Sequence, residues 1–334
     1  MKKLAIGIDI GGINTAFGLV DDEGTVYAEY VVSTKKYPRF DDYQPYVEEL
    51  CGAIKTMLGT VSFDFELTGI GIGAPNANYH TGTIEHPANL WKFTEANAGC
   101  DESLRVFHLA ADIGRRFPGV EVLMTNDANA ATIGEMVYGN ARGMKDFVMV
   151  TLGTGLGSGF VANGEMIYGH DGFAGEFGHV VVRPGGRKCG CGRRGCLEAY
   201  VSATGIKRTA FELMAEMTEP SELRGIAYDD FDSAMVSAAA DKGDPVALEA
   251  FRVTGEMLGK ALADMVVITS PEAVFLFGGL AKAGDKIFEP TKRYMEQNML
   301  SVFKNKVRIL PSGIEGKNAA ILGAAALIWQ HRRA

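Results

Sequence analysis

Three cysteines, Cys189, Cys191 and Cys196, lie within eight residues of one another, and His179 precedes them. Thiolate sulfur and imidazole nitrogen are preferred ligands of tetrahedral Zn²⁺, and the intervening glycines let a short loop wrap around an ion. The alternative is a set of free thiols that happen to be neighbours. The Cys-x-Cys spacing does not match the usual finger signatures. We therefore predict a closed, structural zinc site made of these four residues.

Two carboxylates, Glu176 and Glu198, flank this predicted zinc site. They could accept hydrogen bonds from vicinal hydroxyls of a substrate. A zinc-bound histidine usually offers its other ring N–H to an oxygen acceptor, so His179 could both hold metal and contact substrate. Surface carboxylates are mostly only solvated, but the position of this pair around the metal favours a binding role.

Two glycine turns, Gly11-Gly12 and Gly153-Thr154-Gly155, directly follow predicted strands. Such turns offer backbone N–H groups to phosphate oxygens without a side chain in the way, although tight hairpins also need glycine for conformational reasons. The chain has no Walker motif, and the second turn misses the dinucleotide fingerprint and leads into a strand rather than a helix. Two turns at matched positions favour ATP.

Acidic residues stand beside these elements. Asp9 closes the first strand, where it could hold the Mg²⁺ that accompanies ATP or simply cap the turn. Asn126 and Asp127 follow another strand and open a predicted helix, so either could be an N-cap. A carboxylate at the mouth of a cleft could instead accept a hydroxyl proton during phosphoryl transfer.

The elements that position these residues form two similar halves. A three-strand meander begins at Leu4, and a second begins at Phe147, with Gly12, Gly18 and Val20 matching Gly153, Gly159 and Val161 at one constant offset. At that offset Val150 matches Asp9. Chance similarity is one explanation and a duplicated domain is the other. Further strands are predicted at Leu67–Ile72, Val120–Met124, Ala273–Phe277 and Val307–Leu310, with helices at Pro45–Leu58, before Phe117, after an Asp244 N-cap and from Ala319. Each half is an α/β unit.

Length and composition restrict the class of protein. At 334 residues the chain exceeds the usual size of one hydrophobic core, so two domains with a cleft between them are expected. Its 33 Lys and Arg against 41 Asp and Glu, a net charge of −8, argue against nucleic-acid and anionic-membrane binding.

The sequence predicts neither a signal peptide nor a membrane-spanning segment, which favours a soluble protein of the reducing cytoplasm. Asp9 and the first glycine turn cut the N-terminal apolar run too short for a signal peptide, and the stretch Ala319–Trp329 is too short to span a bilayer. The clustered cysteines do not suggest a disulfide framework, and Cys51 and Cys100 are expected to be ordinary buried thiols.

With these residues in place, the sequence resembles the ROK family (repressor, open reading frame, kinase) across nearly its whole length, and the bacterial glucokinases of that family look nearest. The His179 and three-cysteine pattern ending at Glu198 is the most specific element. The other matching motifs are Asp9-Ile10-Gly11-Gly12, Gly73-Ala74-Pro75, Asn89-Leu90, Asn126-Asp127-Ala128-Asn129-Ala130, Leu152-Gly153-Thr154-Gly155, Gly175-Glu176-Phe177-Gly178-His179 and Gly278-Gly279.

The resemblance implies an α/β fold of the actin-like (hexokinase-like, ribonuclease H-like) ATPase type. It implies an N-terminal domain at 1–125, a C-terminal domain at 126–316 and a last helix at 317–334 that returns to the first domain. It also implies Asp127 as general base, with a homodimeric or homotetrameric assembly. The implied sugar ligands are Asn89, Asn126, Asp127, Glu176, His179 and Glu198, and the implied nucleotide-site residues are Asp9, Gly11, Gly12, Thr15, Gly153, Thr154, Gly155, Gly278 and Gly279.

The implied activity is transfer of the γ-phosphoryl group of ATP to the 6-hydroxyl of glucose, with Mg²⁺ and structural Zn²⁺ as cofactors. N-acetylmannosamine, N-acetylglucosamine, fructose and allose are alternative substrates. A repressor or another non-catalytic sugar-sensing protein is the alternative of a different class, disfavoured by the strand that begins at Leu4 and by the intact Asp127. Ile13 stands where family members commonly have threonine, and Ala16 where a polar residue is frequent, so weaker ATP binding is expected.

Overall fold

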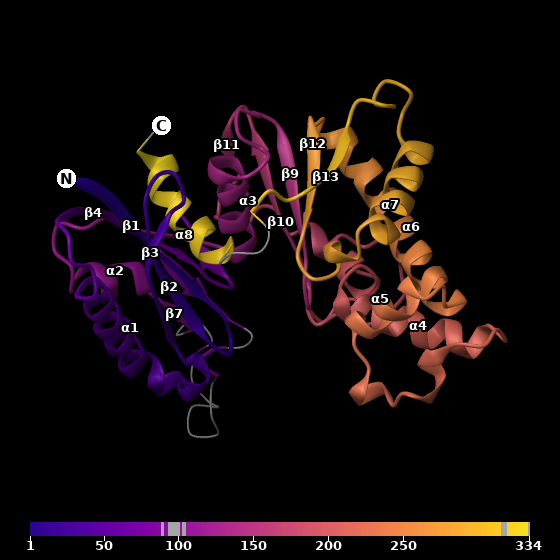
Figure 1. Cartoon of the computed structure of the whole chain (residues 1–334), viewed down its shortest axis with the longest axis horizontal. Helices are drawn as coiled ribbons and strands as arrows, with labels where there is room; N and C mark the ends of the chain where they lie inside the picture. Colours follow the sequence, from indigo (N-terminus) through magenta and orange to yellow (C-terminus); the bar gives the residue numbers. More distant parts are fainter. Residues whose placement is uncertain (88–89, 93–100, 102–104, 315–318, 333–334) are drawn as a thin grey trace. The chain divides into compact units, whose positions relative to one another are not determined.

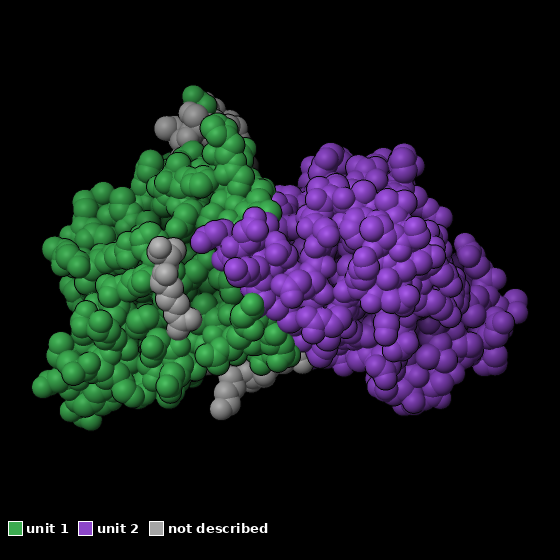
Figure 2. All heavy atoms as spheres, turned by 90° about the horizontal axis from the view of Figure 1, so that it is seen from above, with its two compact units in different colours: residues 1–143, 166–174, 313–334 green, residues 144–165, 175–312 purple. Residues whose placement is uncertain are grey.

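The structure, a computed structural model, describes residues 1–87, 90–92, 101, 105–314 and 319–332. The chain divides into two compact units, coloured separately in Figure 2. Unit 1 comprises Met1–Gly143, Met166–Ala174 and Gly313–Ala334, and unit 2 comprises Met144–Glu165 and Gly175–Ser312. Within the described ranges, no helix is both long enough and apolar enough to cross a membrane.

Unit 1 is built on a five-stranded sheet (Figure 1). Its strands, in spatial order, are β3 (Val26–Val32), β2 (Thr15–Val20), β1 (Lys2–Ile10), β4 (Phe65–Gly73) and β8 (Val122–Thr125). The first three form the predicted antiparallel meander, while β1, β4 and β8 run parallel. The carboxyl ends of these parallel strands therefore meet at one edge of the sheet.

Alternation along β1 explains how helices cover both faces of this sheet. Leu4, Ile6 and Ile8 share a buried core with α1 (Tyr43–Leu58), whereas Ala5 packs in a separate cluster with α8 (Ala319–His331). Helix α8 lies directly on the strands, because a Cβ at Gly71 would collide with the carbonyl oxygen of Ala324. A glycine at this position of β4 permits that close approach.

Helix α3 (Asp127–Tyr138) belongs to unit 1 rather than to the second unit. A Cβ at Gly134 would stand 2.9 Å from the Cα of Gly323, so α3 and α8 touch backbone to backbone. The expected domain boundary lies before residue 126, whereas this packing keeps residues 126–143 with unit 1. The remaining elements of the unit are α2 (Leu109–Gly114) and a small sheet of β5 (Ala77–Asn78), β6 (Thr83–Glu85) and β7 (Val106–Phe107).

Unit 2 repeats the strand order of unit 1, which favours a duplicated domain over chance similarity. Its strands, in spatial order, are β11 (Glu165–Met166), β10 (Leu156–Ala162), β9 (Phe147–Leu152), β12 (Ala273–Phe277) and β13 (Arg308–Pro311). One detail of the predicted repeat is wrong. The β9–β10 loop is one residue shorter than the β1–β2 loop, so the pair Asp9–Ala16 corresponds to Thr151–Gly157, and Thr151 rather than Val150 matches Asp9.

Four helices cover the second sheet: α4 (Ala203–Glu216), α5 (Ser233–Asp241), α6 (Pro245–Thr269) and α7 (Asp285–Asn298). The predicted cap of α6 is confirmed, because the Asp244 carboxylate accepts the N–H groups of Val246 and Ala247, each at 3.0 Å. Residues Leu258 and Leu262 of α6 join the strands in one buried core.

Candidate active site

Asp9 and Asp127 lie at the same edge of the unit 1 sheet. Asp9 on β1 pairs with Gly73 on β4, and Gly73 pairs with Thr125 at the end of β8. Asp127 follows two residues later as the first residue of α3. In open α/β sheets, ligands bind outside the carboxyl ends of the parallel strands. The fold therefore presents both carboxylates where a ligand would be expected.

Asn126 is the N-cap of α3. Its side-chain oxygen accepts the Ala128 N–H at 2.8 Å, and the Asp127 carboxylate accepts the same N–H at 2.8 Å. One cap is therefore supplied by Asn126, so Asp127 is not needed for that purpose. Its negative charge at the positive end of the α3 dipole is favourable.

Both carboxyl groups have a pKa above the usual range. Burial and the nearby charge of Asp127 raise the pKa of Asp9 to about 6. Partial desolvation by the surrounding protein likewise raises the pKa of the Asp127 carboxyl, and the hydrogen bond from the Ala128 N–H opposes this shift. The Asp127 side chain nevertheless remains accessible to solvent. Carboxyl groups that combine a raised pKa with an accessible position are candidates for proton transfer.

The first glycine turn is the loop of the β1–β2 hairpin. Gly11 donates its N–H to the carbonyl of Asn14 at 3.0 Å, and the side chain of Ile13 at the tip is 65% exposed. Because the Ile13 side chain is exposed, it adds no buried apolar surface to the fold. Packing therefore does not explain why an isoleucine stands at this position.

Thr15 begins β2 and is fully buried. Its hydroxyl lies 2.8 Å from that of Thr34 and 2.6 Å from that of Tyr46. The resemblance implied a nucleotide contact for Thr15, but this hydroxyl points into the core of unit 1. The side chain therefore supports the turn from beneath.

The second glycine turn connects β9 and β10 in unit 2. Gly153 donates its N–H to the carbonyl of Gly155 at 3.0 Å, and Gly153 and Thr154 are exposed. Gly278 follows β12 with φ 101°, and a Cβ there would stand 2.7 Å from the carbonyl oxygen of Leu152. This residue must therefore be glycine, whereas a Cβ at Gly279 would point into open space.

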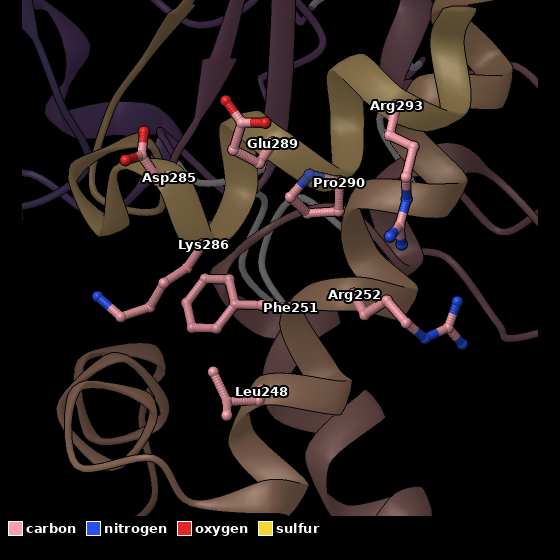
Figure 3. Close-up of a pocket in the computed structure, with 8 residues that line it drawn as sticks. All are labelled: Leu248, Phe251, Arg252, Asp285, Lys286, Glu289, Pro290 and Arg293. Carbon is pink, nitrogen blue, oxygen red and sulfur yellow. The ribbon is translucent and has the colours of Figure 1, made fainter. Parts of the chain in front are cut away.

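Gly279 also lines a pocket of about 440 Å³ between α5 and the segment after β12. Its lining is mainly apolar, and Ser233, Ser237, Asp241 and Lys282 supply the polar groups. A second pocket, of about 290 Å³, lies between α6 and α7 (Figure 3). Its Arg252 binds Glu249 and Glu256, and its Lys286 binds Asp241, so these cations neutralise carboxylates of the protein itself.

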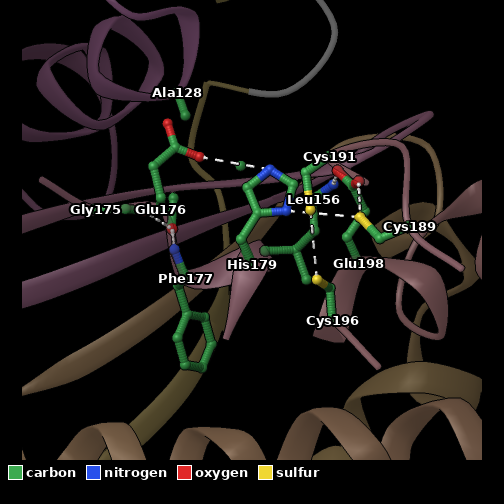
Figure 4. Close-up of polar contacts among 12 residues, drawn as sticks. Ala128, Leu156, Gly175, Glu176, Phe177, His179, Cys189, Cys191, Cys196 and Glu198 are labelled. Atoms are coloured by element: carbon green, nitrogen blue, oxygen red, sulfur yellow. Dashed lines mark hydrogen bonds and ion pairs between the residues drawn. The ribbon is translucent and has the colours of Figure 1, made fainter. Parts of the chain in front are cut away.

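The side chains of His179, Cys189, Cys191 and Cys196 converge, with all four ligand atoms within 4.8 Å of one another (Figure 4). The sulfurs of Cys191 and Cys196 are 3.7 Å apart, and so are the Cys189 sulfur and the His179 Nδ1. Around tetrahedral Zn²⁺, with bonds of about 2.1 Å to nitrogen and 2.3 Å to sulfur, ligand atoms stand about 3.6 to 3.8 Å apart. The donor set and its spacing fit that ion.

Glu176 lies on the far side of the His179 ring (Figure 4). Its carboxylate is 3.9 Å from Nε2, while Nδ1 faces the cysteines. Ser158 of β10, which no sequence motif singled out, holds this turn: its hydroxyl donates to the Gly175 carbonyl and accepts the Phe177 N–H at 3.3 Å. The only signal in the sequence was a small polar residue in a glycine-rich strand.

Glu198 joins the metal-ligand cluster to the second glycine turn. One carboxylate oxygen accepts the Leu156 N–H at 3.1 Å, and the other lies 3.4 Å from the Cys189 sulfur. Unit 2 thus brings together Glu176, His179, Glu198 and the second turn, whereas Asp9, Asn126 and Asp127 gather in unit 1. Asn89 lies outside the described residues.

Comparison with known proteins gives one family. The ROK family model matches residues 5–331. A glucokinase of Halalkalibacterium halodurans is 32% identical over 332 residues, covering 97% of this chain and 94% of that protein. A xylose repressor of Bacillus subtilis is 27% identical over 331 residues, covering 98% of this chain and 77% of the repressor.

Solved structures agree with this result. The crystal structure of a ROK family glucokinase from Streptomyces griseus, in complex with glucose and AMPPNP, matches with a TM-score of 0.77 at 30% identity. The match covers 98% of this chain and 99% of that one. The chain thus has the predicted α/β architecture, the two-domain actin-like ATPase fold of ROK sugar kinases.

Proposed function

This chain belongs to the ROK family, and from that premise we propose that it is an ATP-dependent hexose kinase acting on the 6-hydroxyl of glucose. The observation that carries the proposal is the solvent-accessible Asp127 carboxylate, spared the capping role by Asn126 and set beside Asp9 at the ligand-binding edge of a sheet. Glucokinases of similar length, about 30% identical to this chain, support glucose as the first substrate to test.

In this proposal Asp127 is the general base. Its carboxylate would accept the proton of the attacking hydroxyl as the bond to phosphorus forms, a contribution of about 10²- to 10⁴-fold in rate. The raised pKa of Asp127 makes its carboxylate a better proton acceptor. Asn126 would orient the sugar from the same helix start.

The two glycine turns would hold the phosphates through backbone N–H groups. Asp9 would hold the Mg²⁺ of the nucleotide, which would neutralise the phosphate charge when bound. The pocket beside Gly279 would receive the nucleoside, since its volume and its mainly apolar lining with a few polar groups suit a small ligand.

The four-residue metal cluster would hold structural Zn²⁺, which would supply rigidity to a loop whose residues 190–194 are exposed. His179 would then ligate through Nδ1 and present Nε2–H to Glu176 or to a sugar hydroxyl. Glu198 and Asn89 would complete the hydroxyl-binding set. We further propose a homodimer or homotetramer located in the cytoplasm.

A sugar-sensing protein without catalysis is the second candidate, favoured by the match to the xylose repressor. Both candidates bind a sugar, so binding alone does not separate them. Only a kinase transfers phosphate.

The test is ATP-dependent phosphorylation with Mg²⁺ across glucose, fructose, allose, N-acetylglucosamine and N-acetylmannosamine, run together with calorimetric binding of each sugar. Turnover of glucose above the other sugars supports the proposal. Turnover of a different sugar supports the kinase activity and identifies that sugar, rather than glucose, as the substrate. Binding without turnover of any sugar supports the sensor.

A further inference from the structure

Arg187 lies two residues before Cys189, in a segment that carries several exposed charges, yet its side chain is only 8% exposed. A buried guanidinium is costly unless its hydrogen bonds are satisfied. The phosphoryl-transfer chemistry does not use this residue. Its burial therefore calls for a separate account.

All five N–H donors of the guanidinium have partners. Nε and one Nη2 donor bind the two carboxylate oxygens of Glu212 at 2.9 and 2.6 Å, and Nη2 also donates to the Thr209 hydroxyl at 3.0 Å. Nη1 donates to the carbonyls of Ala199 at 3.0 Å and Gly205 at 3.1 Å. Three of these partners belong to α4, and Ala199 ends the short 3₁₀ helix Leu197–Ala199.

The backbone of Arg187 closes the base of a small hairpin, residues 187–195, which we call the cysteine hairpin. Its N–H donates to the Tyr200 hydroxyl at 2.9 Å, and its carbonyl accepts the Gly195 N–H at 2.9 Å. Further along the hairpin, Lys188 pairs with Arg194. The guanidinium also lies 4.5 Å from the centre of the Tyr200 ring.

One side chain thus joins three elements: the cysteine hairpin with Cys189 and Cys191, helix α4, and the 3₁₀ helix that contains Glu198. We propose that Arg187 is a positioning residue that clamps the cysteine hairpin onto α4 and thereby keeps both the metal ligands and Glu198 in register. The part of this inference that concerns sugar binding rests on the proposed function, whereas the part that concerns metal retention does not.

A lysine cannot replace this clamp. Its ammonium has three donors on a flexible stem, whereas five donors in a planar fork are used here. Loosening groups that orient metal ligands typically costs about 10- to 100-fold in metal affinity or activity. Substitution of Arg187 should therefore release the metal faster and weaken sugar binding, and it should affect nucleotide binding less, because Glu198 reaches the second glycine turn through one hydrogen bond only.

The experiment uses full-length protein loaded with one Zn²⁺ per chain. We would compare Arg187→Lys and Glu212→Gln with a control, Arg208→Lys, because Arg208 donates a single hydrogen bond to the Lys188 carbonyl of the same hairpin. The rate of zinc transfer to an excess of chelator is measured first, followed by KM for glucose and for ATP.

For Arg187→Lys we expect zinc transfer about tenfold faster or more, a KM for glucose raised by a similar factor, and a KM for ATP within about twofold of wild type. Glu212→Gln should shift in the same direction by less, and it decides the matter if Arg187→Lys does not fold. Unchanged zinc transfer in both variants overturns the clamp, as does an equal rise of both KM values with zinc retained.

If the wild type phosphorylates no sugar, the proposed function fails on its own account. Zinc transfer still tests the clamp in that case. Sugar affinity measured by calorimetry then replaces KM.

Discussion

Asp9 and Asp127 face a common edge of one sheet, and burial together with the charge of Asp127 raises the pKa of Asp9 to about 6. Two carboxylates in this relationship repel each other when both are ionised. A divalent cation relieves that repulsion, and so does a proton. The edge is therefore electrostatically prepared for a cation before any ligand arrives.

This relationship predicts a pH-dependent stability. The folded pKa of Asp9 exceeds its usual value of 3.8, so between pH 4 and 6 the native state binds more protons than the unfolded state, and stability falls as pH rises through that window. A shift of this size corresponds to at most about 3 kcal/mol. Asp9→Asn should remove the effect, giving a variant more stable than wild type at pH 7 but not at pH 4.

Urea unfolding at pH 4, 5, 6 and 7, without Mg²⁺, measures this difference. Asp22→Asn, a change in the exposed turn between β2 and β3 at the other end of the sheet, serves as the control and should follow wild type. Parallel pH profiles for wild type and Asp9→Asn would show that Asp9 is not under electrostatic stress.

The residue after β12 gives a steric prediction with a matched control. Gly278→Ala forces a Cβ against the Leu152 carbonyl at φ 101°, which should cost about 1 to 3 kcal/mol of unfolding free energy. Gly279→Ala meets open space and should change stability by less than about 0.5 kcal/mol. Guanidinium denaturation compares the two, and equal losses would contradict the described backbone.

Metal removal should destabilise unit 2. Cys191→Ser loses one ligand of the cluster, so metal analysis should find less than one zinc per chain. We expect the melting temperature to fall by about 4 to 8 °C, the shift that a loss of about 2 kcal/mol gives in a domain of this size. Cys51→Ala changes a thiol of α1 in unit 1 and should retain full zinc. Equal zinc content in both variants would rule out the predicted site.

Ile13 offers a gain-of-function prediction. The side chain is 65% exposed at the tip of the first turn, so Ile13→Thr should fold normally. A hydroxyl donor near the phosphates should lower the KM for ATP by about fivefold, the equivalent of a hydrogen bond of about 1 kcal/mol. Val302→Thr, at an exposed position of unit 2, should leave this KM unchanged. No change in either variant would place Ile13 away from the nucleotide.

Features set by local sequence were predictable. The strand-turn-strand halves, the Asp244 cap and the proximity of the cysteine ligands all follow from short-range spacing. The motifs shared with the ROK family predicted the fold in which these local features are combined.

Features set by tertiary packing were not predictable. The Thr15 hydroxyl points inward because Tyr46 of α1 reaches it, and α3 groups with unit 1 because Gly323 of α8 meets it. The burial of Arg187 depends on Glu212, 25 residues away in the chain. Each depends on a contact between distant residues that hydrophobic periodicity does not encode.

The most direct test of the central claim is the rate of glucose phosphorylation by Asp127→Asn, which keeps the size of the side chain and removes its basicity. Asp285→Asn is the matched control, since Asp285 is the exposed first residue of α7 as Asp127 is of α3. We predict that kcat for Asp127→Asn falls by at least about 10²-fold, with KM for glucose and ATP within a few-fold of wild type and Asp285→Asn unaffected. A kcat within about threefold of wild type would contradict the account, because a general base contributes far more than that.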